Sequence, residues 1–298
     1  MKIILSVLLF FACNTASAQI TDTLSTLKKK SFNAYYSKGY KERTKSIAAV
    51  LEKAFNYHKK HLSFTPAFEL LVLDSTDWKT YSMRGAPYGV PHYIDNKKRL
   101  VVAAHDNQLW KSFLPPADKL PPTYKESIIA TYRNKEGQLS SQAFFDLLAI
   151  HELGHAFLNQ AGVKMQRQWL SELYCNIFLH SFIAEKQKQL LPALTLLPRM
   201  FGEQSAKDFK YTSLKDLQNH YNDIATKAPR NYGWYQCRWH AGAANIYDAD
   251  RNAARKLWDA FSQQKDKLSD EALLEMLDKS GNKGVADLIR NWDKDTVL

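Results

Sequence analysis

The sequence predicts an α+β protein in which a helix-and-sheet N-terminal lobe precedes a mainly helical C-terminal lobe. Two observations support this class. Short β-rich runs bounded by Asp, Asn, Gly and Pro occur between residues 68 and 103. Helical patterns fill the chain after the proline-rich stretch Pro115 to Pro122. With 298 residues, 45% of them hydrophobic, the chain can bury a sizeable core.

The first eighteen residues have the pattern of an export signal. Lys2 gives a positive start, Ile3 to Ala12 form an apolar run, and Ala16 to Ala18 provide small residues for cleavage. Ten apolar residues are too few to cross a bilayer, which takes roughly 20. We therefore expect a periplasmic or extracellular protein that begins near Gln19 after cleavage, with lipid attachment through Cys13 as the alternative.

The N-terminal lobe, residues 19–135, begins with a helical pattern. Leu24 to His61 are rich in Lys, Ala, Glu and aromatic residues and contain no proline, which predicts one long or two shorter amphipathic helices. Gly39 is the candidate break between them. Three runs that follow are strand candidates and predict a small sheet: Phe68 to Leu73, Tyr88 to Ile94 and Leu100 to Ala103.

Residues 136–187 and the C-terminal lobe, residues 188–298, are predicted to be helical. Ser140 and Ser141 can cap a helix that runs to about Gln160, where Gly162 supplies a stop signal. A second helix runs from about Met165 to Lys186. Further helical patterns cover Leu191 to Phe201, Ser213 to Ile224, Tyr235 to Ala249, Arg251 to Gln263 and Ser269 to Trp292.

The first of these helices contains an H-E-x-x-H motif, His151-Glu152-Leu153-Gly154-His155. Because residues four apart share a helix face, both histidines can direct an imidazole at one ion about 2 Å away. Glu152 is turned about a quarter turn from His151, which places its carboxylate beside the ion. Zinc suits this set, because it binds imidazole and lowers the pKa of water to about 7, so that a carboxylate can take the proton.

Glu172 is the predicted third ligand, since a catalytic zinc needs three protein ligands and an open position. If the chain reverses between the two helices, Glu172 lies roughly 10 Å from the turn and His155 roughly 7.5 Å from it. Glu185 and His180 lie farther along and would overshoot. One turn beyond Glu172, Asn176 can accept the second ring N–H of a zinc-binding histidine, and a plain helix-face asparagine is the alternative.

These residues resemble the gluzincin superfamily, the thermolysin-like and aminopeptidase-like zinc metallopeptidases. His151, His155 and Glu172 match the zinc ligands of that group, Glu152 matches the base, and Asn176 matches the acidic or amide position one turn later. The resemblance covers about residues 144–182, and no subfamily is assigned. It implies a small mixed zincin-like sheet packed on the active-site helix, with an edge strand that pairs with substrate, supplied by Tyr88 to His92 or Leu100 to Ala104.

The resemblance also implies a Tyr or His from the C-terminal lobe that donates a hydrogen bond to the oxyanion. Residues 231–240 concentrate such side chains at the start of a predicted helix. Tyr235 is the first candidate. Arg238 and His240 follow as donors or as binders of a substrate carboxylate, with aromatic packing between the lobes as the alternative for each.

The sequence thus predicts an exported metallopeptidase with one zinc per chain, in which Glu152 is the general base for a zinc-activated water. The alternatives are a non-catalytic binding protein with a basic ligand cleft on a peptidase scaffold, and a zinc hydrolase of non-peptide amides or esters. The net charge of +11 suits acidic surfaces or substrates, although the basic residues are spread as on solvated helix faces. We expect a peptide or protein substrate, no nucleic-acid partner and no membrane span. The oligomeric state and a Cys175–Cys237 disulfide are left open.

Overall fold

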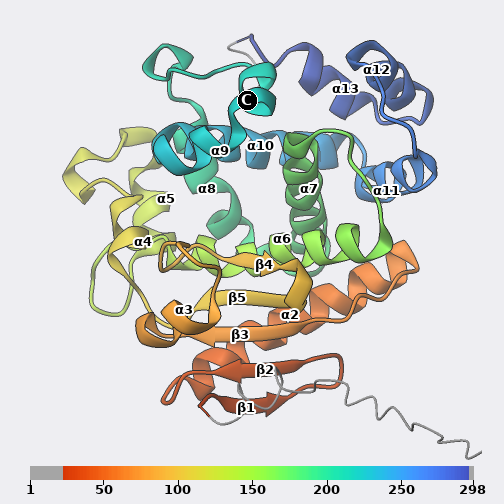
Figure 1. The fold of residues 1–298 in the computed structure, drawn as a ribbon. Coiled ribbons are helices and arrows are strands. Elements are labelled where there is room, and N and C mark those ends of the chain that lie inside the picture. Colours follow the sequence, from red (N-terminus) through yellow and green to blue (C-terminus); the bar gives the residue numbers. More distant parts are fainter. Residues whose placement is uncertain (1–22, 295–298) are drawn as a thin grey trace, which may run out of the picture.

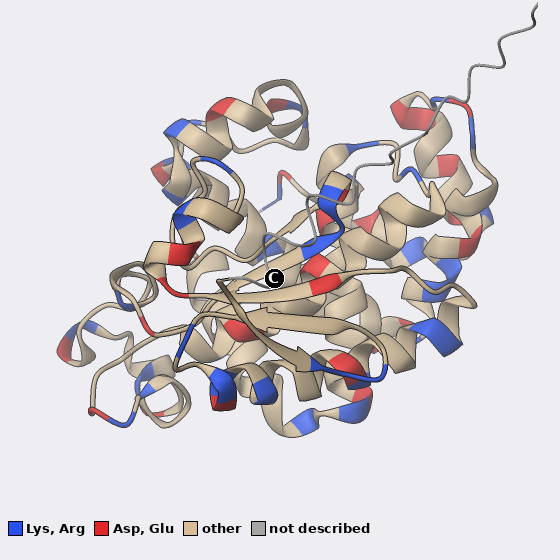
Figure 2. Ribbon diagram, turned by 60° about the horizontal axis from the view of Figure 1, so that its bottom comes forward, with Lys and Arg blue, Asp and Glu red and all other residues tan. Residues whose placement is uncertain are grey.

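The computed structural model describes residues 23–294 (Figure 1). The predicted signal segment, with Cys13 and the cleavage site, lies outside the described residues. The α+β class is confirmed: a small mixed sheet lies at one end of the molecule, and a mainly helical lobe extends beyond one edge of it. Charged side chains of both signs are interspersed over the elements rather than gathered on one of them (Figure 2).

The described residues form one five-stranded sheet in the order β1-β2-β3-β5-β4. The inner strands β2, β3 and β5 are parallel, while β1 and β4 are antiparallel to their neighbours at the two edges. Their bounds are β1 Ser25–Lys28, β2 Asn33–Tyr36, β3 Glu69–Leu73, β4 His92–Ile94 and β5 Arg99–Ala103. After their charged first residues, Glu69 and Arg99, strands β3 and β5 are continuous apolar runs, as expected where both faces of a parallel sheet are covered. Helix α2, Lys41–Leu62, connects the parallel strands β2 and β3.

Two expectations about the N-terminal lobe are corrected. Residues 25–36, expected to be helical, form the β1–β2 hairpin, because Tyr35 and Tyr36 pair with β3 and become buried. Pairing with a neighbouring strand outweighs the weak local preference of such a segment. Leu100 to Ala104 is not an edge either, since β5 pairs on both sides. The edge beside the helical lobe is β4, and only the last three residues of the expected strand Tyr88 to Ile94, from His92, form it.

The helices that follow α2 include two short ones that were not predicted, Ser75–Tyr81 and Gln108–Ser112, and otherwise keep the predicted order. They are α3 Ser75–Tyr81, α4 Gln108–Ser112, α5 Pro122–Tyr132, α6 Gln142–Ala161, α7 Gln168–Lys186, α8 Leu191–Gly202, α9 Leu214–Lys227, α10 Pro229–Ala249, α11 Ala253–Gln263, α12 Asp270–Lys279 and α13 Lys283–Arg290. Helix α6 ends as expected at Gly162, which has a φ of 68° and donates to carbonyls of the last turn. The expected helix 269–292 is two helices, because the chain turns at Gly281 with a φ of 73°.

Helix α6 lies against the edge strand β4, and α7 and α10 pack above it (Figure 1). The core is continuous from the sheet into this helical lobe. Within residues 23–294, Cys175 and Cys237 are free, buried thiols. A search of the same residues finds no helix whose length and apolar character would suffice to cross a membrane.

Candidate metal centre

Helices α6 and α7 approach each other closely at Gly154. A Cβ atom at this position would lie 3.0 Å from the Sγ atom and 3.3 Å from the Cα atom of Cys175. Glycine therefore lets the two backbones come together without a clash. Side chains that lie within about one helical turn of the crossing, on α6 and on α7, therefore come within reach of a common point.

The three predicted ligands meet beside this crossing. The Nε2 atoms of His151 and His155 are 3.2 Å apart. Glu172 places Oε2 3.3 Å from the first nitrogen and Oε1 3.6 Å from the second. A tetrahedral zinc ion with bonds of about 2.0–2.1 Å keeps its ligand atoms roughly 3.3–3.4 Å apart. The donor atoms thus have the spacing that such an ion requires, and these three residues fit it.

The protonation states of His155 and Glu172 also suit a cation. Burial lowers the pKa of His155 to about 4, so its imidazole is neutral at neutral pH. Burial acts to raise the pKa of Glu172, but the two histidines and a hydrogen bond from Gln236 outweigh it and hold the value at about 2. The site therefore presents a lone pair and an ionised carboxylate. At His151, burial acts to lower the pKa, but a hydrogen bond with Glu172 and the charges of Glu152 and Glu172 outweigh it and raise the value, so a bound cation would displace a proton there.

Asn176 orients the ring of His151. Its Oδ1 atom lies 2.7 Å from Nδ1 of His151, and an amide oxygen can only accept, so Nδ1 carries the proton. The other ring nitrogen, Nε2, is then the one with a free lone pair, and it faces His155 and Glu172. The structure thus brings the predicted supporting residue to the ligand that needs it.

Glu152 lies next to the ligands without joining their triangle. Burial raises the pKa of its carboxyl group to about 8, against the lowering effects of His151 and of a hydrogen bond from the backbone N–H of Tyr93. Tyr93 belongs to the edge strand β4. The carboxylate predicted to act as the base therefore lies between the ligand group and the free edge of the sheet.

Cys175 is a second candidate for the third ligand position. Its sulfur and one nitrogen from each histidine form a group whose atoms all lie within 4.8 Å of one another. The oxygens of Glu172 lie 3.3 and 3.6 Å from the two Nε2 atoms, which is close to the ligand spacing of tetrahedral zinc. Burial, followed by the charges of Glu172 and Glu152, raises the pKa of the thiol well above its usual value, so zinc would have to displace a proton from Cys175, whereas Glu172 is already ionised. The arrangement favours Glu172, with Cys175 as the packing residue of the helix crossing.

Helices α9 and α10 contribute groups that the sequence analysis did not single out. Gln236 Nε2 donates to Oε2 of Glu172 at 2.9 Å and to Oη of Tyr232 at 2.8 Å. The hydroxyls of Tyr232 and Tyr221 are 2.9 Å apart, and that of Tyr221 lies 3.5 Å from Oε1 of Glu172. Tyr232 and Gln236 are four residues apart on one helix face, which is a signal that the sequence did contain.

Tyr235 and Arg238 do not lie with the ligands. Tyr235 donates from Oη to the carbonyl of Ser213 at 2.8 Å, and its ring stacks on that of Trp292. Arg238 lies over the rings of Trp234 and Trp292 and donates to the carbonyl of Trp292. Both side chains therefore face the C-terminal end of the chain, on a different side of α10 from Gln236. This placement corrects their predicted roles at the site.

His240 lies closer to the three candidate ligands than Tyr235 and Arg238 do, and it packs between His151 and Phe144. Its ring centroid is 6.3 Å from that of His151 and 5.1 Å from that of Phe144. Burial holds the pKa of its imidazole well below the usual value. His240 is therefore a neutral, packed side chain behind His151.

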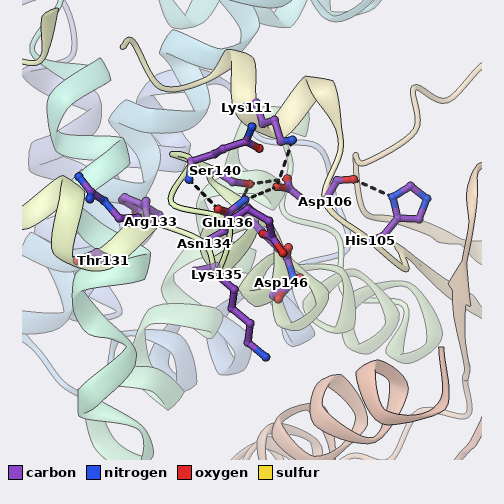
Figure 3. Close-up of a pocket in the computed structure, with 14 residues that line it drawn as sticks. His105, Asp106, Lys111, Thr131, Arg133, Asn134, Lys135, Glu136, Ser140 and Asp146 are labelled. Atoms are coloured by element: carbon purple, nitrogen blue, oxygen red, sulfur yellow. Dashed lines mark hydrogen bonds and ion pairs between the residues drawn. The ribbon is translucent and has the colours of Figure 1, made fainter. Parts of the chain in front are cut away.

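A hollow of about 640 Å³ lies at the other end of α6, and none of the three ligands lines it (Figure 3). The carboxylate of Asp106 is its central group. This carboxylate accepts hydrogen bonds from Ser140 Oγ at 2.6 Å and Asn134 Nδ2 at 3.1 Å, with Lys111 Nζ 3.9 Å away. Asp106 thereby joins three segments that approach the start of α6. These contacts give the hollow a structural role in holding the first turn of that helix.

Comparisons with known proteins add no relative: no model of a known protein family matches the chain, and no curated protein matches it. What the chain can do chemically therefore follows from its own residues. His151, His155 and Glu172 can hold a cation, and Glu152 can exchange a proton beside it.

Proposed function

We propose that this protein is an exported zinc metallopeptidase. The observation that carries the proposal is the spacing of His151, His155 and Glu172, whose donor atoms lie 3.2 to 3.6 Å apart in a buried site beside Glu152. Two imidazoles and one carboxylate form the ligand set of hydrolytic zinc sites. When bound there, zinc supplies Lewis acidity, which polarises a carbonyl group and lowers the pKa of water.

Glu152 moves the proton in the proposed reaction. Its carboxylate accepts a proton from the attacking water and donates it to the leaving amine. Burial raises the pKa of this carboxyl group in the metal-free protein, whereas zinc bound beside it would lower that pKa and favour the ionised form that a base requires. The backbone N–H of Tyr93 holds the carboxylate in place.

The free edge of β4 supports an extended peptide as the substrate. Strand β4 pairs with β5 on one side only, and its other side lies toward α6. Since the N–H of Tyr93 reaches Glu152, Tyr93 directs its backbone groups to that free side. Its carbonyl can then accept an N–H from a peptide laid alongside the strand.

Tyr221 takes the place proposed earlier for Tyr235 as the donor to the developing oxyanion. Its half-buried hydroxyl lies 3.5 Å from Oε1 of Glu172. Burial, and then the charge of Glu172, raises the pKa of this phenol, so the hydroxyl keeps the proton that a donor needs.

Cleavage of a mixed peptide library by the purified protein tests the proposal. We expect one zinc per chain, and cleavage that stops when a chelator removes the zinc and returns when zinc is restored. The Glu152→Gln variant should keep its zinc, because Glu152 is not a ligand, and should lose about a hundredfold or more of the activity. Metal content and library cleavage are measured on the same samples.

Glu185→Gln is the matched control, because it neutralises a carboxylate near the far end of α7. This variant should retain full activity. A folded, zinc-loaded protein that cleaves no peptide in the library would contradict the peptidase. Hydrolysis of non-peptide amides or esters by that protein would favour the alternative hypothesis of a zinc hydrolase with other substrates. Ligand binding that is unaffected by Glu152→Gln would favour the hypothesis of a binding protein.

A further inference from the structure

A second hollow, of about 450 Å³, lies at the turn between α6 and α7. Four of its lining residues are basic and none is acidic; the basic ones are Lys164, Arg167, Lys265 and Lys267. Arg167 is paired with Asp270 at 2.6 Å. The three lysines form no ion pair with any residue of the described part of the chain. The lining of the hollow therefore has an excess of positive charge, and among the described residues none of its three lysines is neutralised by an ion pair.

The hollow continues the face of each helix that carries the metal ligands. On α6, Asn159 lines the hollow and lies four residues after His155. On α7, Gln168 lines it and lies four residues before Glu172. Residues four apart share a helix face and are separated by about 6 Å along the axis. The hollow thus begins roughly one helical turn from the ligands, on their side of both helices.

The two lysines opposite the turn are carried by a segment that is held in place. Gln166 donates through Nε2 to the carbonyl of Asp266 at 3.1 Å, and its Oε1 accepts from the N–H of Leu268 at 2.9 Å. Arg167 donates to the carbonyl of Leu268 at 2.9 Å. Gln166 has a φ of 67°, a conformation that is uncommon for residues other than glycine and persists where surrounding contacts fix it. The segment between α11 and α12 is therefore fastened to the α6–α7 turn.

We propose that this hollow binds an acidic side chain of the substrate, so that Lys164, Lys265 and Lys267 select peptides with Asp or Glu close to the scissile bond. The inference rests on the proposed peptidase function and deepens it by naming the substrate class. A residue bound at the ligands, followed along an extended peptide at about 3.3 Å per residue, brings a carboxylate to the hollow within one to three residues. Three ammonium groups around one carboxylate favour an acidic over a neutral side chain, and the preference weakens as salt screens it.

Binding to the zinc-loaded Glu152→Gln variant tests the proposal without turnover. The probes are two fluorescein-labelled peptides that differ only in carrying Glu or Gln at their central positions. We expect the Glu peptide to bind more tightly. Combined substitution of Lys164→Gln, Lys265→Gln and Lys267→Gln should raise its Kd by about fivefold to tenfold, from three solvated ion pairs. The Kd of the Gln peptide should stay within about twofold, because that peptide forms none of these pairs.

The control removes the same charge elsewhere. Lys53, Lys59 and Lys60 are exposed on α2, outside the hollow, and their combined change to Gln should leave both Kd values unaltered. Equal weakening of both peptides by the hollow variant, or equal weakening of the Glu peptide by the control, overturns the proposal. If the protein discriminates between the two peptides but the wild-type protein cleaves no peptide, the acidic-peptide site is upheld and the peptidase function is contradicted. Failure of this inference can therefore be distinguished from failure of the proposed function.

Discussion

Glu172 fixes the charge at the centre. Its carboxylate lies near the Nε2 atoms of His151 and His155 and accepts a hydrogen bond from Gln236 at 2.9 Å. These partners keep it ionised although it is buried. An ionised carboxylate with two neutral imidazoles leaves one net negative charge, which a divalent cation overcompensates, so that positive charge is available to polarise a bound carbonyl.

Replacement of Glu172 and of Cys175 separates the two candidates for the third ligand. Glu172→Gln should lower zinc affinity by about a hundredfold or more, because it removes the charged ligand. Cys175→Ala should leave one zinc per chain with unchanged affinity, since Glu172 supplies the third ligand in the proposed site. Competition with a fluorescent chelator measures both. Loss of zinc from Cys175→Ala and not from Glu172→Gln would make the cysteine the ligand.

The two tyrosines provide a matched pair. Tyr221→Phe should lower kcat by about tenfold to a hundredfold while zinc content is unchanged, because an oxyanion donor is lost. Tyr235→Phe should keep full activity. It should lower the free energy of unfolding by about 1 kcal/mol, since it removes the buried hydrogen bond to Ser213. Steady-state kinetics and urea unfolding distinguish these outcomes, and the reverse pattern would restore the role first expected for Tyr235.

The crossing of α6 and α7 sets the size of the ligand triangle. His151 and His155 flank Gly154 on one helix, and Glu172 lies one turn before the contact made by Cys175 on the other. The separation of the two backbones therefore determines the distance between the imidazoles and the carboxylate. A residue that touches no metal can control how well the metal fits.

Gly154→Ala tests this control. The added Cβ would meet Cys175 Sγ at 3.0 Å, so the helices must separate by a few tenths of an ångström. We expect a loss of about 1–3 kcal/mol in the free energy of unfolding, together with weaker zinc binding. Denaturation of the metal-free protein measures the first effect, and chelator competition measures the second. Recovery of zinc affinity in the Gly154→Ala, Cys175→Gly double variant would tie both losses to the crossing, and no recovery would argue against this cause.

The sequence predicted those elements whose signal is local. The apolar runs of β3 and β5, the stop at Gly162 and the positions of α6 and α7 all follow from patterns within a few residues. Hairpin geometry then sufficed to select Glu172 from the carboxylates of α7. The hairpin β1–β2 was missed because its stability comes from pairing with β3, which lies more than thirty residues away.

The rest of the site could not be read locally because it depends on the rotation of α10. This helix begins at Pro229, a favoured first residue, and not near Tyr235 as expected. Its earlier start adds Tyr232 to the face that carries Gln236. The packing of α10 on α7 decides whether the face of Gln236 or the face of Tyr235 turns toward Glu172. The rotation of α10 about its own axis does not follow from the local sequence pattern.

The molecule as a whole consists of a sheet lobe and a helical lobe that share one core and meet along β4 and α6. The candidate ligands come from α6 and α7, the proposed base Glu152 contacts β4, and Gln236 comes from α10. The site therefore depends on the relative placement of both lobes. Its buried ionisable groups also affect the stability of the entire chain.

The stability of the chelated protein should be level between about pH 4.5 and 6.5, where the contributions of His155 and Glu152 change in opposite directions, and should fall above pH 6.5. Burial lowers the pKa of His155 from 6.5 to about 4, so its contribution is complete above pH 6.5 and is lost as pH falls toward 4. Burial raises the pKa of Glu152 from 4.5 to about 8, so its contribution is complete below pH 4.5 and is lost as pH rises toward 8. Above pH 6.5 the loss at Glu152 is no longer offset by His155.

Urea unfolding of the chelated protein at several pH values measures this profile. Glu152→Gln should remove much of the decline between pH 6.5 and 8, because glutamine does not titrate. An unchanged decline in that variant would show that the carboxyl of Glu152 is not its source. Addition of zinc should flatten the profile of the wild-type protein.

The hydrogen bond from Gln236 to Glu172 has a consequence for the lifetime of the protein. Any ion held by His151, His155 and Glu172 is bound by two helices and supported by a third, so it binds the folded chain and not the unfolded one. By mass action, free metal at a hundred times its Kd adds about 2.7 kcal/mol to the free energy of unfolding. Under the proposed function, the concentration of metal around the exported chain would govern how long each molecule escapes degradation, as well as how fast it works.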